Sequence, residues 1–206
     1  VRTATGAAGA AERRVACKVG KKARRQGASR VIVVRATGTR ATVEACRRTR
    51  DGYVVAFRAD GWVGRNGVAP RGAKREGDGR TPSGTFRLTR GFGVEADPGL
   101  RHHSWLQVDE RDVWVDDPRS SLYNRHARLP VRGRWSSAER LKLSPASDYA
   151  QVIAYNTKAR PYRGSAIFLH VSQGRPTAGC VAVPRAKLLR LLRFQRAGSY
   201  ISIRRA

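Results

Sequence analysis

The feature that most constrains this chain is a series of short apolar runs, each closed by a turn before it is long enough for a helix. Between residues 31 and 64 these runs are β-branched or alternate in polarity. Asp51-Gly52 and Asp60-Gly61 lie between successive runs. Asp-Gly between such runs is a strong hairpin signal. The pattern predicts a β-meander without a helix, which suits a sandwich or a barrel.

The remaining patterns predict more strands and one helix. Further strands are expected over residues 85–89, 151–155, 166–171 and 199–204. Leucines at helical spacing after Pro184 predict a helix over Ala186–Phe194. Residues 91–149 are long and irregular, and we expect their aromatic residues to be core anchors rather than a groove lining. We therefore predict a mainly-β domain over 31–206, with a long irregular insertion and one packed C-terminal helix.

The charge balance favours an anionic partner. The formal net charge is +27, and a field this positive suits a wall polymer, an anionic membrane or nucleic acid. Coding bias is an equal explanation for part of the arginine excess. Residues 1–30 are expected to form a basic arm or a short helix over Ala10–Gln26, without the interleaved aromatics of a nucleic-acid reader.

No apolar run approaches the roughly 18 residues of a membrane span, and no leader is visible. Because the chain contains no Met, a trimmed form that has lost its leader fits equally well.

The cysteines are three in number: Cys17, Cys46 and Cys180. An odd count in a secreted protein suggests one disulfide and one free thiol. Cys17 and Cys46 are the natural pair, which leaves Cys180 free. Three unrelated buried thiols in a cytosolic protein remain the alternative.

The stretch Gly164–Pro184 brings a nucleophile and a base close together in sequence. His170 ends one apolar run, a Gly/Pro-rich loop follows, and Cys180 enters the next run. An imidazole accepts the proton of a thiol that attacks a carbonyl. Gly179 allows backbone N–H groups to approach a substrate oxygen, and Thr177 either orients the imidazole or donates to the substrate. Taken alone, a Cys and a His in neighbouring apolar strands are more often packed core residues.

Two motifs in this order resemble the L,D-transpeptidase (YkuD-type) catalytic domain. His170 followed by Thr177-Ala178-Gly179-Cys180-Val181 resembles the family's histidine and Ser/Thr-x-Gly-Cys signature. The stretch 77–86, which contains Thr81-Pro82-Ser83-Gly84, resembles its upstream G-x-x-T-P-x-G element. The resemblance covers about residues 31–204 and implies a β-sandwich-like fold with Cys180 as nucleophile and His170 as base. Thr177, Ala178 and Gly179 would then form the oxyanion and substrate-binding shell.

The chain departs from the family pattern at several positions. Ala178 stands where many members have a second histidine, Ala182 where many have Arg or Asn, and Val171 where Gly is usual. These departures suggest a divergent, actinobacterial-like branch. Arg185 is the candidate for binding the substrate carboxylate, on its proximity in sequence.

The resemblance implies acyl transfer on peptidoglycan stem peptides, with no metal and no cofactor. Cys180 would release the terminal D-alanine of a tetrapeptide stem, and the thioester would pass to an amine of a neighbouring stem, giving a 3→3 crosslink. If water intercepts the thioester, the same site is an L,D-carboxypeptidase. Expected partners are stem peptides and anionic wall polymers, with carbapenems as acylating inhibitors and no specific nucleic acid. We expect a monomer that is secreted or bound to the cell wall. The competing hypothesis is a non-enzymatic basic module that binds wall polymer or nucleic acid.

Overall fold

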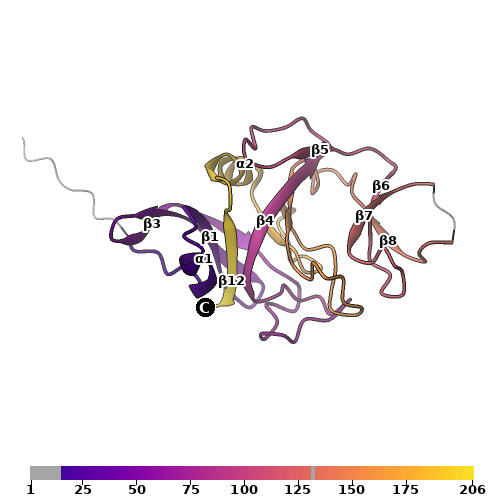
Figure 1. The fold of residues 1–206 in the computed structure, drawn as a ribbon, viewed down its shortest axis with the longest axis horizontal. Helices are drawn as coiled ribbons and strands as arrows, with labels where there is room; N and C mark the ends of the chain where they lie inside the picture. The colour runs from indigo at the N-terminus through magenta and orange to yellow at the C-terminus, as the bar shows by residue number, and fades with distance from the viewer. Residues whose placement is uncertain (1–14, 131–132) are drawn as a thin grey trace, which may run out of the picture.

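A computed structural model describes residues 15–130 and 133–206 of the chain (Figure 1). Its first three strands form the expected antiparallel meander: β1 (Arg30–Thr37), β2 (Arg40–Thr49) and β3 (Gly52–Trp62). Gly38 and Gly52 take positive φ angles of 58° and 128° in the two turns, which glycine adopts without steric cost.

One sheet of nine strands contains the meander and continues through later segments. The strand order is β12-β1-β2-β3-β11-β10-β9-β4-β5. The later strands are β4 (Gly84–Gly93), β5 (Trp105–Gln107), β9 (Ala150–Ile153), β10 (Phe168–Val171), β11 (Val181–Val183) and β12 (Tyr200–Arg205). Because β12 also pairs with β4, eight of these strands close into a ring and β5 extends from β4. The mainly-β prediction is confirmed.

Burial on two faces explains the continuous β-branched run of β1. Ile32 and Val34 point into the main core, where the helix α2 (Arg185–Phe194) adds three leucines at positions 188, 191 and 192. This helix starts directly after Pro184, as the sequence predicts. Val31 and Val33 point to the opposite face because side chains alternate along a strand. A strand covered on both faces needs no polar alternation.

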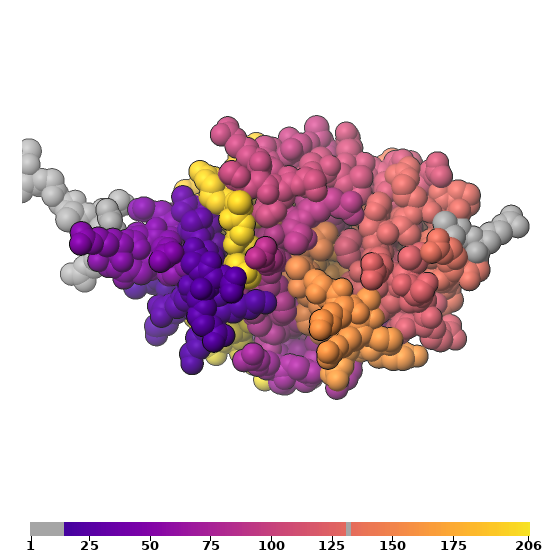
Figure 2. Space-filling view, in the orientation of Figure 1, coloured from indigo at the N-terminus to yellow at the C-terminus, as the bar shows by residue number. Residues whose placement is uncertain are grey.

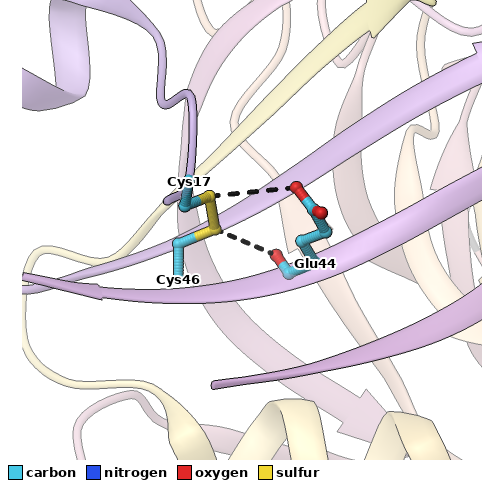
Figure 3. A group of neighbouring side chains, drawn as sticks. All are labelled: Cys17, Glu44 and Cys46. Atoms are coloured by element: carbon cyan, nitrogen blue, oxygen red, sulfur yellow. Dashed lines mark hydrogen bonds between the residues drawn. A yellow bond between two sulfur atoms is a disulfide. The ribbon is translucent and has the colours of Figure 1, made fainter. Parts of the chain in front are cut away.

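The N-terminal segment covers the second face of β1. From residue 15 it runs along β3, where Ala16 forms a bridge with Val54, and it contains the short helix α1 (Lys21–Arg25). Cys17, Val19 and Ala23 are buried against Tyr53 and other residues of this face. A disulfide joins Cys17 to Cys46 of β2, with Cα atoms 6.1 Å apart (Figure 3). The described part of the expected basic arm is therefore packed rather than solvated. The first part of the Ala10–Gln26 helix prediction lies outside the described residues, and a domain boundary at residue 30 stays a prediction.

The insertion contains strands that the sequence did not predict. Besides β5, it forms a separate sheet in the order β7-β6-β8, from β6 (Asp112–Val115), β7 (Arg125–Arg128) and β8 (Ala138–Arg140). This sheet lies at the opposite end of the molecule from α1 (Figure 1). Trp114 and Tyr123 are buried, as expected of core anchors. In Figure 2 the surface of the insertion adjoins the segment that precedes β10, and Asn124 Nδ2 donates hydrogen bonds to the carbonyls of Tyr155 and Asn156 there.

No helix among the described residues is long and apolar enough to cross a membrane.

Candidate functional site

A cavity of about 600 Å³ contains both members of the predicted Cys/His pair. Its wall is formed by the loops around β10 and β11, by the insertion, and by the loop between β3 and β4. Thr177, Ala178 and Gly179 also line it. Segments that lie far apart in the sequence therefore meet around His170 and Cys180.

The strand register places the pair on one face of the sheet. The strands β10 and β11 run parallel, with His170 beside Ala182 and Leu169 beside Val181. Cys180 directly precedes β11 and lies level with Phe168, two residues before His170. Since side chains alternate along a strand, Cys180 and His170 point to the same face as diagonal neighbours. Diagonal neighbours lie about 7–8 Å apart at their backbones, and among the described residues no hydrogen bond joins Sγ of Cys180 to the ring of His170.

The thiol of Cys180 is buried among backbone groups. Its Sγ accepts a hydrogen bond from the N–H of Phe168 at 3.3 Å and donates to the carbonyl of Ala166, also at 3.3 Å. Burial raises the pKa of this thiol, the charge of Glu139 raises it further, and the Phe168 N–H and Lys74 act in the opposite direction. The resting group is therefore a neutral thiol.

Ala166 has a backbone conformation that is uncommon outside glycine. Its φ is +51°, and its N–H donates to Oδ1 of Asn124 at 3.1 Å. Such a conformation costs about 1–3 kcal/mol and persists only where the surrounding structure holds it. Asn124, from the insertion, stabilises this conformation through its hydrogen bond with the N–H of Ala166. It thereby fixes the backbone whose carbonyl accepts the hydrogen bond from the Cys180 thiol.

His170 has a defined tautomer. Its Nδ1 lies 2.8 Å from the carbonyl oxygen of Val171, which only accepts hydrogen bonds. Nδ1 therefore carries the proton and Nε2 is left as an acceptor. Burial lowers the pKa of the imidazole, against a smaller opposite effect of the Val171 carbonyl, so the ring is neutral. A backbone carbonyl thus fills the orienting role that a carboxylate has in many catalytic triads.

Thr177 orients the cysteine loop rather than the imidazole. Its Oγ1 donates to the carbonyl of Cys180 at 2.7 Å and accepts from the N–H of Gly179 at 3.1 Å. Thr81 of the upstream motif donates to the same carbonyl at 3.3 Å, and its own Oγ1 accepts from the N–H of Gly64. The two motifs of the sequence therefore meet at the backbone of Cys180.

Gly179 allows the backbone of the cysteine loop to approach the loop before β4 closely. A Cβ at this position would lie 3.1 Å from the carbonyl oxygen of Arg80, tighter than most real contacts. Because its N–H already donates to Thr177, Gly179 is not a free donor for a substrate oxygen. Among the described residues, the backbone N–H of Cys180 itself donates to no acceptor.

Arg185, the expected carboxylate-binding residue, lies outside the pocket. Its guanidinium pairs with Asp148 and with Glu95 at 3.7 Å, and it stacks over the ring of Tyr149 at 4.8 Å. The cationic side chains that do line the pocket are Arg65, Lys74 and Arg175. Lys74 is held by Asp78 at 2.7 Å, which leaves Arg65 and Arg175 as the candidates for an anionic group.

Three carboxylates that no sequence motif indicates also line the pocket, and we call them the acidic wall: Glu76, Asp116 and Glu139. They come from the loop before β4 and from the small sheet of the insertion, so no local motif contains them. Glu76 accepts hydrogen bonds from Tyr123 and from Ser165.

One group of described residues has the spacing of metal ligands, and it lies outside the pocket. It consists of Cys17, Glu44 and Cys46, whose ligand atoms are within 4.8 Å of one another. The two sulfurs are joined in a disulfide, so they are not the thiolates that bind a metal (Figure 3).

Comparison with known proteins gives one clear match. The family model of the L,D-transpeptidase catalytic domain (YkuD) matches residues 29–203, from the start of β1 into β12. A search of curated proteins finds no match. The match concerns the family as a whole, and the expected actinobacterial-like branch stays a prediction. The match covers most of the chain and includes Cys180, His170 and the cavity that contains them. The protein therefore belongs to the L,D-transpeptidase catalytic domain family, whose members carry out acyl transfer on peptidoglycan.

Proposed function

We propose that this protein is an L,D-transpeptidase that forms 3→3 crosslinks between peptidoglycan stem peptides, with Cys180 as nucleophile and His170 as general base. The observation that carries the proposal is the placement of both side chains on one face of adjacent parallel strands, inside a cavity of about 600 Å³. Family membership supplies the substrate class.

The first half-reaction forms a thioester. Nε2 of His170 takes the thiol proton as Sγ attacks the carbonyl carbon of the third stem residue. The bond to the terminal D-alanine then breaks, and its nitrogen leaves with the proton from His170. Because burial raises the pKa of the thiol and lowers that of the imidazole, the proton moves during attack and no ion pair is needed beforehand.

The loop 177–180 supports this step. The negative charge that develops on the carbonyl oxygen needs a donor placed beforehand, and the unengaged N–H of Cys180 is the group we assign to it. Thr177 and Thr81 hold the Cys180 carbonyl, and Thr177 also holds the N–H of Gly179, so the backbone is fixed on both sides of that N–H. Ala178 lines the substrate side, and Arg65 and Arg175 replace Arg185 as candidates for the substrate carboxylate.

In the second half-reaction an amine of a neighbouring stem attacks the thioester carbonyl, and Cys180 is released. Attack by water at the same point gives an L,D-carboxypeptidase, which is the second candidate. A non-enzymatic basic module is the third candidate, and it leaves the Cys180–His170 arrangement without a role.

The proposed location is outside the cytoplasm, at the cell wall. The Cys17–Cys46 disulfide supports it, because disulfides persist in oxidising compartments. The net charge of +27 suits anionic wall polymers as partners.

Carbapenem labelling followed by intact-protein mass spectrometry tests the nucleophile. We expect one covalent adduct, located on Cys180 by peptide mapping and absent from Cys180→Ala. A disaccharide-tetrapeptide substrate then tests the reaction, with a crosslinked dimer that has lost one D-alanine as the expected product. Absence of any adduct, together with tight and salt-sensitive DNA binding, would favour the basic-module reading.

A further inference from the structure

The segment 164–166, just before β10, has an unusual backbone and receives the thiol of the nucleophile. Gly164 and Ala166 take positive φ angles of 97° and 51°. The carbonyl of Ala166 accepts the hydrogen bond from Sγ of Cys180 at 3.3 Å. A residue other than glycine keeps a positive φ only where the surrounding structure holds it. Whatever holds this segment therefore also decides where the resting thiol points.

Two adjacent residues of the insertion hold the segment, and both lie directly before β7. The hydroxyl of Tyr123, a residue that is 1% exposed, accepts a hydrogen bond from the N–H of Gly164 at 3.0 Å. The same hydroxyl donates to the carboxylate of Glu76. Oδ1 of Asn124 accepts from the N–H of Ala166 at 3.1 Å. The first and the last N–H of the segment are thus bonded to neighbouring side chains of one turn.

The side-chain amide of Asn124 uses all of its hydrogen-bonding capacity. Besides the Ala166 N–H, its Oδ1 accepts from Nε1 of Trp114 at 2.9 Å. Its Nδ2 donates to the carbonyls of Tyr155 and Asn156 at 3.0 and 3.1 Å. An amide side chain has two acceptor sites and two donors, so the orientation of this amide is fixed. The positive φ of Asn124, 56°, explains a preference for Asn or Gly here, but glycine would lack all four bonds.

Neither Tyr123 nor Asn124 lines the pocket. They therefore affect the reaction through the backbone of the segment and not through contact with a substrate. The group that they present to Cys180 is the Ala166 carbonyl, and the resting thiol donates to this carbonyl rather than to the ring of His170.

We propose that Tyr123 and Asn124 are positioning residues for the nucleophile. They hold Ala166 in its left-handed conformation, and its carbonyl then keeps the Cys180 thiol in one orientation until a substrate enters the pocket. This inference rests on the proposed role of Cys180 as the nucleophile. It has two consequences. The carbonyl stabilises the neutral thiol, so its loss should make the thiolate easier to form. A thiol without a fixed orientation is also aligned for attack less often.

The variants separate this role from a general one in packing. Asn124→Gly keeps the positive φ at no steric cost and removes only the amide. Asn124→Gly/Ala166→Gly adds a residue that adopts a φ of 51° without being held. Tyr123→Phe keeps the ring and removes the hydroxyl. Asn66→Ala is the matched control, because Asn66 is exposed, donates one hydrogen bond to the carbonyl of Asp78 at 2.9 Å and does not line the pocket.

Two measurements are made on each variant after near-UV circular dichroism has shown that it is folded. The first is the rate of Cys180 alkylation by iodoacetamide as a function of pH, followed by intact-protein mass. We expect Asn124→Gly to raise this rate at least about fivefold at about pH 8, since more thiolate is present. The second is D-alanine release from a tetrapeptide stem. Here kcat should fall about tenfold in Asn124→Gly while KM stays within about twofold, since neither side chain touches the substrate.

Tyr123→Phe should change both quantities in the same directions by smaller factors, and Asn66→Ala should match wild type. The double variant should return both quantities to within about threefold of wild type, because glycine needs no support at position 166. An unchanged alkylation rate in Asn124→Gly overturns the inference, and so does a loss of kcat that Ala166→Gly does not restore. If Asn124→Gly does not fold, Tyr123→Phe decides, and an unchanged alkylation rate there overturns it. Alkylation needs no turnover, so wild-type protein that releases no D-alanine removes the proposed function while the alkylation rates still decide this inference.

Discussion

Two sites in this molecule combine cysteine with carboxylate, and they differ in whether the groups have partners. At the N-terminal end Cys17 and Cys46 form a disulfide beside Glu44 (Figure 3). The buried Glu44 accepts hydrogen bonds from Arg35 at 2.8 Å and from Arg58 at 2.9 Å. In the pocket Cys180 is a free thiol, and none of Glu76, Asp116 and Glu139 has a cationic partner at salt-bridge distance among the described residues.

The difference separates groups that hold the fold from groups that are available for chemistry. Glu44 is 1% exposed and both of its arginines come from the sheet itself, so its charge is neutralised whether or not anything binds. In the pocket the three carboxylates are not neutralised by a cation, and Oδ1 of Asp116 has no hydrogen-bond partner among the described residues, an unfavourable arrangement of the kind that is common at functional sites. Substitutions at the first site should therefore change stability, and substitutions at the second should change activity.

The largest expected effect is that of Cys180→Ser. The side-chain volume is nearly kept, but the hydroxyl is a much weaker nucleophile at neutral pH, so kcat/KM for D-alanine release should fall at least about 10³-fold. The midpoint of thermal unfolding should change little. D-Alanine release is measured with a coupled oxidase assay, and retention of wild-type turnover would assign the nucleophile to another group.

Removal of the proposed base should have the next largest effect. His170→Ala should slow acylation about 10²–10⁴-fold, with His102→Ala, an exposed imidazole, as the control. Because burial lowers the pKa of His170 below 6.5, the base stays neutral to lower pH. The acid limb of the wild-type kcat/KM profile should therefore lie below pH 6.5. A limb above that value would show that a protonated imidazole is the resting form.

Loss of the disulfide should lower the stability of the fold and leave the activity nearly unchanged. Cys17→Ala/Cys46→Ala should lower the free energy of unfolding by about 3 kcal/mol, because the bond restricts the unfolded chain across a separation of 29 residues. Carbapenem acylation of Cys180 should stay within about twofold of wild type. Chemical denaturation gives the first quantity, and a comparable loss of acylation rate in the folded protein would mean that the two sites are coupled.

Glu44→Gln should act in the same direction with a smaller effect. The substitution removes the charge that Arg35 and Arg58 share, for a loss of about 2 kcal/mol in the free energy of unfolding. Asp97→Asn, at an exposed position without a salt bridge, is the control and should change little. If Glu44→Gln unfolds at the same denaturant concentration as wild type, the paired carboxylate does not stabilise the sheet.

Features that depend on local sequence patterns could be predicted, and features that depend on tertiary contacts could not. The longer strands, α2 and the Cys180–His170 pair follow from local patterns: turn residues, alternation, leucine spacing and a short motif. The parallel register of β10 and β11 depends on closure of the whole sheet, and β6 to β8 are too short and too charged to show a period. The acidic wall consists of residues from separate segments of the chain. The ion pair between Arg185 and Asp148 joins residues 37 positions apart. These features are tertiary, so a single sequence does not display them.

The smallest expected effect is the pH dependence of the free energy of unfolding that comes from Glu139. Although Glu139 is exposed in part, desolvation in the pocket and the charges of Asp116 and Glu76 raise its pKa from 4.5 to about 7, so the folded protein binds this proton more tightly than the unfolded chain. The resulting stabilisation is complete below pH 4.5 and is lost as the pH rises through about 7. Because the side chain is solvent-accessible, we expect it to be below about 1 kcal/mol. Glu110, whose pKa is lowered by its hydrogen bond from Lys142, should show the opposite trend. Urea unfolding of wild type, Glu139→Gln and Glu110→Gln at pH values from 4 to 8 measures both trends. A difference between wild type and Glu139→Gln that does not change with pH would mean that Glu139 is an ordinary surface carboxylate, and the contrast with Glu44 would then rest on Asp116 alone.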